Sequence, residues 1–321
     1  MIKAAVIDRT LNPHIIGPAI PVEIMTAAQA GGMPIEAKSI RVVRAKDSDI
    51  AAGLYKVAGQ RPIPMIVVPE GIDSIGGPVQ PVYVVSGVLD VFEYTNKMLA
   101  LGPIQYLTQT DLSGSVALDS SPFARNGAYT GVTLGQAGIG DGLTSAGFDG
   151  ATSFDNAFSA SLAAAFSGAQ GSFVTWGAVA NPGVWLDGVT RRIILFQVDA
   201  NNRIGINKSA SNNEVDWLMV AGGVSKSGGI TSFNPLGFFS AGLTWDKAND
   251  QVKFYINGTQ SGPTLTGLGV FAGSLSATQT IIGSLSTAAA QVWNGSLAHL
   301  ATFNRTLSAS EMLSSATRVT P

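Results

Sequence analysis

The chain has 321 residues, of which 45% are apolar and only 12% are Asp, Glu, Lys or Arg, against about 25% in an average soluble domain. Its net charge of −2 excludes a nucleic-acid-binding protein that relies on bulk basic charge, and no apolar run approaches the ~18 residues of a membrane helix. The absence of cysteine excludes a disulfide scaffold and thiolate metal sites. Such low charge is typical either of neutral polar strands or of a surface covered by partners or further copies of the chain.

The first residues do not form a signal peptide. Asp8, Arg9 and Pro13 lie where a signal peptide needs an apolar core. We therefore expect synthesis in the cytoplasm of the producing cell without an export signal.

Residues 1–103 differ in composition from the rest of the chain. They contain ten of the 15 prolines and none of the five tryptophans, and proline repeatedly precedes short runs of strand-forming residues. These runs predict a β-rich domain over 1–103, with strands at 20–25, 39–45, 63–68, 80–85 and 88–94. Proline-opened edge strands can pair with a partner strand, so this domain is the expected attachment and self-association region.

Residues 104–321 contain short strands separated by turns rich in Gly, Asn and Asp. Val252–Ile256 followed by Asn257-Gly258 is typical of a strand that enters a type I′ hairpin. Further strands are predicted at 191–198, 238–245 and 281–282. Ser308 and Glu311 form a capping-box pattern, which predicts one short C-terminal helix. The fold class is therefore all-β, a two-sheet jelly-roll sandwich over 104–321 closed by that helix.

Several segments in this region resemble the LamG-like, concanavalin A-like jelly roll. The motifs, in order, are Gly114–Ser121, Arg125–Val132, Ala146–Gly150, Gly171–Trp176, Leu243–Gly258 and Trp293–Glu311. The resemblance implies two curved antiparallel sheets packed face to face, with Trp176 and Trp245 in the core. It implies function only loosely, because this fold serves lectins, adhesion modules, enzyme appendages and virion parts.

The two-part chain, without cysteine or signal peptide, is similar to phage virion proteins that carry a LamG-like domain on an attachment domain. We therefore predict a non-enzymatic capsid decoration or minor capsid protein on the particle surface. Residues 1–103 would bind the major capsid protein or another virion protein, and the jelly roll would face outward. The alternative is a carbohydrate-binding adhesin, in a tail fibre or on a cell surface, that recognises a host glycan.

No catalytic motif is complete. Glycosidases on this fold use Glu-x-Asp-x-x-Glu on one strand face, and here only Glu214 and Asp216 match. The two histidines, His14 and His299, lie far apart in the sequence without a nucleophile elbow, and we expect His299 to be half-exposed. Gly135–Gly142 lacks the lysine of a phosphate-binding loop and reads as a connection between strands. We predict no enzyme activity.

Calcium is the ion that the resemblance implies, although we predict no resident cofactor or metal. Four aspartates in or near turns supply the hard oxygens that calcium prefers, but without the spacing of a calcium loop. These are Asp149, Asp155, Asp187 and Asp199.

The expected ligand-binding residues are Trp185, Asp187 and Trp217. Trp185 and Asp187 lie in the loop-like Asn181–Gly188, and Trp217 follows a polar stretch. An exposed indole beside a carboxylate can bind the apolar face and the hydroxyls of a sugar. Local packing is the alternative role of both tryptophans.

Overall fold

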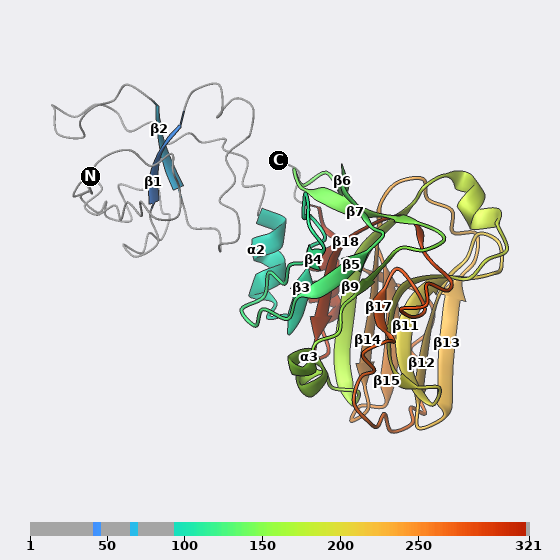
Figure 1. Cartoon of the computed structure of the whole chain (residues 1–321). Coiled ribbons are helices and arrows are strands. Elements are labelled where there is room, and N and C mark those ends of the chain that lie inside the picture. The colour runs from blue at the N-terminus through green and yellow to red at the C-terminus, as the bar shows by residue number, and fades with distance from the viewer. Residues whose placement is uncertain (1–40, 46–64, 70–92, 319–321) are drawn as a thin grey trace. The chain divides into compact units, whose positions relative to one another are not determined.

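The computed structural model describes residues 41–45, 65–69 and 93–318 (Figure 1). The chain divides into two compact units, Met1–Leu89 and Asp90–Pro321. The division falls before the predicted boundary at 103/104, because residues 93–104 pack against the jelly roll. None of the helices in the described ranges is both long and apolar enough to cross a bilayer.

In the first unit, β1 (Arg41–Ala45) pairs in parallel with β2 (Met65–Pro69). This confirms the strands predicted at 39–45 and 63–68. Those predicted at 20–25 and 80–85, and most of the predicted β-rich domain, lie outside the described residues. The strand predicted at 88–94 is wrong at its end, where Glu93 begins a helix.

The second unit is a sandwich of two antiparallel sheets, which confirms the predicted fold class. We call the sheet with the order β13-β12-β11-β10-β17-β8-β5-β4 the front sheet. Its strands are β4 (Val116–Ala117), β5 (Gly127–Thr130), β8 (Phe154–Asn156), β10 (Arg191–Asp199), β11 (Asn202–Lys208), β12 (Val215–Ala221), β13 (Val224–Ile230) and β17 (Thr280–Ile282).

The back sheet has the order β16-β15-β14-β9-β18-β7-β6, and β3 also pairs with β18. Its strands are β3 (Gln105–Leu107), β6 (Thr133–Ala137), β7 (Thr144–Asp149), β9 (Gln170–Val179), β14 (Phe239–Asp246), β15 (Gln251–Ile256), β16 (Thr259–Gln260) and β18 (Asn294–Phe303). The helical elements are α2 (Glu93–Ala100), α3 (Ala160–Ala165), the 3-10 helix η2 (Pro182–Leu186) and α4 (Ala309–Ala316).

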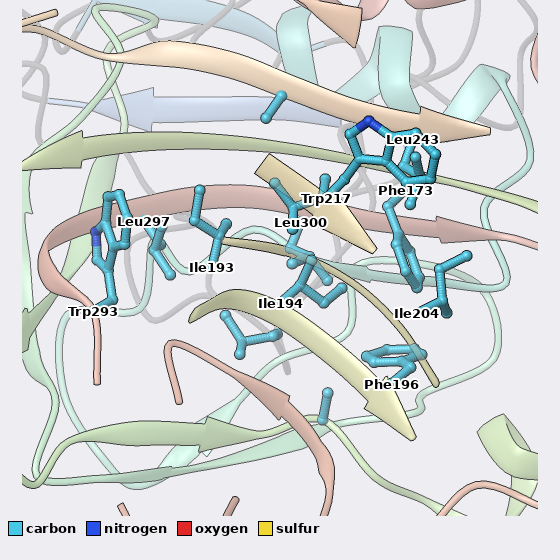
Figure 2. Close-up of a cluster of buried hydrophobic side chains, with 14 of the residues drawn as sticks. Phe173, Ile193, Ile194, Phe196, Ile204, Trp217, Leu243, Trp293, Leu297 and Leu300 are labelled. Carbon is cyan, nitrogen blue, oxygen red and sulfur yellow. The ribbon is translucent and has the colours of Figure 1, made fainter. Parts of the chain in front are cut away.

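Two apolar cores hold the sandwich. The larger one fills the space between the sheets, where Phe173, Phe196 and Leu243 pack with Ile194 and Leu300 (Figure 2). The smaller core lies on the other face of the back sheet. It joins Tyr94 and Met98 of α2 to Trp176 of β9 and Met312 of α4. Strand β9 is therefore buried on both faces.

Two local predictions are confirmed. Asn257 and Gly258 have φ values of 49° and 77°, the left-handed conformation that a type I′ turn requires at both positions. Ser308 and Glu311 form the complete capping box of α4. Trp176 and Trp245 are core residues, as expected. Helices α2 and α3 were not predicted.

Candidate functional site

Trp185 is 1% exposed, so the expectation of an exposed indole is wrong. The Asn181 side chain caps η2 and Pro182 opens it, which turns the ring into the sandwich. The indole Nε1 donates to the Pro235 carbonyl at 3.0 Å, and the ring meets Phe233 edge-on. Trp185 therefore packs within the sandwich, which is the alternative role predicted for it.

Trp217 is also buried, at 4% exposure. The residue lies on β12, where Val215, Trp217 and Met219 face the core in the alternation of a half-buried strand. Trp217 therefore points away from solvent. Its neighbour Asp216 points to the opposite, outer face of the front sheet.

Asp187 forms ion pairs with two basic side chains of the sandwich. Its carboxylate lies 2.7 Å from Arg191 Nε and 2.7 Å from Lys208 Nζ, and the Lys208 side chain is fully buried. Burial raises the pKa of Asp187, but hydrogen bonds from Lys208, Val189 and Arg191 outweigh it and hold the pKa below its ordinary value. Ligand binding by Asp187 stays a prediction.

The outer face of the front sheet carries polar side chains in one register row. Arg192 of β10 pairs with Asn207 of β11, Asn207 with Asp216 of β12, and Asp216 with Gly229 of β13. Strands β11, β12 and β13 lie side by side (Figure 1). We call the side chains of Arg192, Asn207 and Asp216 the polar row.

The polar row is joined by hydrogen bonds. Arg192 donates from Nη1 to Asn207 Oδ1 at 2.7 Å and from Nε to Gln291 Oε1 at 2.8 Å. Asn207 in turn donates from Nδ2 to Asp216 Oδ1. Arg192 and Asn207 are buried and Asp216 is half-buried. The two buried side chains therefore fix the orientation of a carboxylate that solvent can reach.

Electrostatics set the charge of this carboxylate. Burial and the nearby charge of Glu214 together raise the pKa of Asp216 to about 6, against the lowering effects of Arg192, Ser209 and Asn207. Burial also lowers the pKa of Arg192, and the nearby negative charge of Asp216 acts in the opposite direction. A raised pKa brings the titration of Asp216 closer to neutral pH than that of an ordinary aspartate.

Glu214 shares this face, two residues before Asp216. A Cβ added at Gly229 would lie 2.7 Å from Glu214 Oε1 and 2.9 Å from Asp216 Cβ. Glycine on the neighbouring strand therefore leaves room for the two acidic side chains. The third carboxylate of the glycosidase pattern would fall at position 219, which is a buried methionine facing the core.

An apolar row lies beside the polar row. Leu195 pairs with Gly205, and Gly205 with Leu218, on the same outer face. Leu195 is fully buried, and Leu218 is half-buried. The site thus presents two acidic groups next to a partly exposed aliphatic side chain.

His299 is not half-exposed as predicted but fully buried. It lies at a bulge of β18 with a φ of 53°, its Nε2 is 2.9 Å from Asp141 Oδ2, and its Nδ1 is 2.7 Å from the Tyr106 hydroxyl. Asp141 belongs to the glycine-rich connection 135–142. That connection contains the end of β6. Through Asp141 it contributes to a buried polar network with His299 and Tyr106.

Two of the four aspartates considered for calcium accept hydrogen bonds from their own turns. Asp149 accepts from Ala151, Thr152 and Ser153 within its own turn, and Asp199 accepts from Asn201 and Asn202. Within residues 41–45, 65–69 and 93–318, no group of three or more Asp, Glu, His or Cys could hold a metal ion.

Sequence reasoning missed Arg192 and Asn207. Asn207 alternates with the core residue Ile206, and that alternation was available in the sequence. Arg192 lies two residues before Ile194, and the irregular register between them, which the sequence does not show, places Arg192 opposite Asn207. The pairing of β10 with β11 and β12, which brings the side chains together, was not available in the sequence either.

No family model matches the chain, and no curated protein matches it. Several solved structures are similar. Domain 4 of AbnA, an arabinanase from Geobacillus stearothermophilus in complex with arabinotriose, has 19% identity and a TM-score of 0.48, covering 66% of this chain and 97% of that domain. The CBM40 of the Ruminococcus gnavus IT-sialidase has 14% identity and a TM-score of 0.44, covering 54% and 96%.

The botulinum neurotoxin serotype D binding domain has 14% identity and a TM-score of 0.46, and the match covers 66% of this chain and 50% of that one. Likenesses this distant carry no argument about function. The class of protein defined here, a two-sheet β-sandwich with a jelly-roll fold, rests on the strand pairing itself.

Proposed function

We propose that this chain is a non-catalytic glycan-binding protein, whose jelly roll recognises sugar hydroxyls at the polar row and Glu214. The observation that supports this most directly is the chain of hydrogen bonds from Arg192 through Asn207 to Asp216. A carboxylate already held in one orientation loses little freedom on binding. It can accept charge-assisted hydrogen bonds from two neighbouring hydroxyls.

The surroundings of the carboxylate suit a sugar ring. Glu214 adds a second acceptor on the same face, and the half-buried Leu218 offers aliphatic surface to ring C–H groups. All five tryptophans are less than 5% exposed, so stacking on an indole does not contribute. We therefore expect weak binding at one site, which several copies on one particle or surface would strengthen by multivalency.

Catalysis is not part of this proposal. Glycoside hydrolysis needs a pair of carboxyl groups on either side of the scissile bond, one acid and one base or nucleophile. Asp216 is instead tied to Asn207, and the position for a third acid is Met219. The predicted absence of hydrolase activity is tested by reducing-sugar release from a panel of polysaccharides.

The experiment that tests glycan binding is an array probed with the full chain. We expect reproducible binding to one class of glycan, lost in Asp216→Asn. Asp199→Asn, at the exposed end of β10, is the matched control and should bind as the wild type does. Absence of binding to every glycan, at concentrations up to the millimolar range, would overturn the proposal.

A second proposal concerns location. The division at Leu89 supports an attachment unit followed by a recognition unit, as expected for a phage decoration protein bound to the major capsid protein. The test is to add fragments 1–89 and 90–321 to particles stripped of the native protein. Retention of 1–89 alone supports the proposal, and retention of 90–321 alone contradicts it.

A further inference from the structure

The outer face of the front sheet continues beyond the polar row and the apolar row. Gln197 of β10 pairs with Arg203 of β11, and Arg203 pairs with Val220 of β12. Phe196 precedes Gln197, Ile204 follows Arg203, and both lie in the larger core (Figure 2). Because strand residues alternate between faces, Gln197 and Arg203 point to the outer face. We call Gln197, Arg203 and Val220 the third row.

Arg203 has no counter-ion among the residues that the structure describes. Its side chain is half-buried, and across 93–318 no Asp or Glu forms an ion pair with it. Its guanidinium makes no hydrogen bond there either, and its Nε is buried without an acceptor. A charged group that loses hydration without gaining a partner is costly. A bound anion would supply both the opposite charge and the acceptors.

A second side chain of the third row has an oxygen without a donor. Gln197 is 6% exposed, and its Nε2 donates to Gln279 Oε1 at 3.1 Å, whereas its own Oε1 has no hydrogen-bond partner. Paired residues of neighbouring antiparallel strands have Cβ atoms about 5 Å apart, so Gln197 and Arg203 are neighbours on this face. The third row therefore places a cation next to a buried acceptor.

The face is open toward its edge strand. Strand β13 contributes Ser225 to the third row, Ser227 to the apolar row and Gly229 to the polar row, and all three are exposed. These residues are small, so no bulky side chain of β13 covers the three rows from that side. A chain of sugars can therefore lie along β11 and β12 and reach all three rows.

The two ends of this face carry opposite charges. Arg203 and Asn207 are four residues apart on β11, which is about 13 Å at roughly 3.3 Å per residue, and Asp216 pairs with Asn207. The separation exceeds the Debye length of about 8 Å at physiological ionic strength, so Asp216 opposes an anion at Arg203 only weakly. A ligand that is anionic at one end is therefore favoured in one direction along the strands.

From this geometry we infer that the site binds an acidic glycan, whose anionic group, a carboxylate or a sulfate ester, lies at Arg203. The planar guanidinium can donate two parallel hydrogen bonds to such a group. Gln197 Oε1 would accept from a hydroxyl of the same sugar, and hydroxyls of a further sugar would reach Asp216. This inference rests on the proposed glycan binding and adds the charge and the direction of the ligand.

The test is an array of oligosaccharides that contain uronic or sialic acids, each beside its methyl ester, probed with the full chain. Sulfated oligosaccharides beside their desulfated forms make a second arm, which distinguishes a sulfate from a carboxylate. We expect a charged form in one arm to bind about tenfold more tightly than its neutral counterpart, and added NaCl to reduce this preference.

Two substitutions at Arg203 locate the preference. Arg203→Gln should abolish it and still bind the neutral counterpart, and Arg203→Lys, which keeps the charge without the planar fork, should retain part of it. Lys253→Gln is the matched control, because it removes the same charge from a half-buried position on β15 of the back sheet. It should keep the full preference.

Equal affinity for charged and neutral forms in both arms would overturn the acidic-glycan inference and leave the proposed function intact. A preference that survives in folded Arg203→Gln would also overturn it. Absence of binding to every glycan would overturn both. Acidic-glycan binding that is lost in Arg203→Gln but unchanged in Asp216→Asn would support the site at Arg203 and contradict recognition at the polar row.

Discussion

Arg192 donates a 2.7 Å hydrogen bond from its Nη1 to the Oδ1 of Asn207 on the adjacent strand. The bond leaves the Asn207 amide group with its Nδ2 directed at Asp216. Strand pairing therefore places Asn207 where it can donate to Oδ1 of Asp216. The predictions below test this arrangement and the packing around it.

Trp185→Ala should destabilise the protein and not act on ligand binding directly. Removing a buried indole leaves a cavity that typically costs about 4 kcal/mol of unfolding free energy. Leu236→Ala, in the loop after Pro235, is the control because Leu236 is 69% exposed, and it should change stability by less than about 0.5 kcal/mol. Chemical denaturation measures both. If Trp185→Ala is as stable as the wild type but no longer binds the glycan, Trp185 would be a ligand-binding residue after all.

The buried contact between Asp141 and His299 should stabilise the fold at the smaller core. Burial opposes ionisation of Asp141, but contact with His299 outweighs it and lowers the pKa below 3.8. The contribution to stability is therefore present above that pH and is lost as the pH falls through the lower folded value. Asp141→Asn should cost about 3 kcal/mol at pH 7, because it leaves a buried partner unmatched.

The measurement is urea denaturation at several pH values. Asp199→Asn serves as the control and should follow the wild-type curve. If Asp141→Asn is as stable as the wild type at pH 7, the contact is not structural.

The wild type should lose stability as the pH rises from 4 to 7. The cause is Asp155, whose pKa burial raises to about 7 in the folded chain from 3.8. A carboxyl group with a raised folded pKa favours the fold only while protonated, so ionisation costs up to about 4 kcal/mol. Asp155→Asn should flatten this part of the profile when urea unfolding is followed at several pH values. A wild-type profile that rises over the same range contradicts this.

The elements that the sequence predicts well are those specified by neighbouring residues. The Asn257-Gly258 turn and the Ser308–Glu311 capping box depend on φ angles and contacts within four residues, so their patterns identify them. The polar row and the pairing of Asp141 with His299 depend on strand order, which no local pattern encodes.

The burial of Trp185 was also beyond the sequence. Trp185 lies in a polar, loop-like segment, yet the 3-10 helix there directs the ring inward. The alternating pattern of 88–94 predicted a strand that ends at Tyr94, although Tyr94 and Met98 have the i, i+4 spacing of a helix face. Packing of Tyr94 against Trp176 and Ser315 selects the helix instead.

Glycan binding should weaken in acid. Burial raises the pKa of Asp216 to about 6, so the carboxylate that accepts hydroxyl groups is mostly ionised at pH 7 and mostly protonated at pH 5. If the ligand requires the ionised form, affinity should fall about tenfold between these values. Titration at pH 5, 6 and 7 measures this. Affinity that rises in acid would exclude Asp216 as the acceptor.

The most direct test of the central claim is the affinity of Asp216→Asn for the glycan that the wild type binds, measured by isothermal titration beside Asp199→Asn. Asparagine keeps the Oδ1 acceptor for Asn207 and replaces the charged Oδ2 with an NH2 donor of similar size, so the fold should be retained. We expect binding at least about tenfold weaker, the loss of one charge-assisted hydrogen bond, with the control unchanged. Wild-type affinity in a folded Asp216→Asn protein would contradict glycan recognition at the polar row.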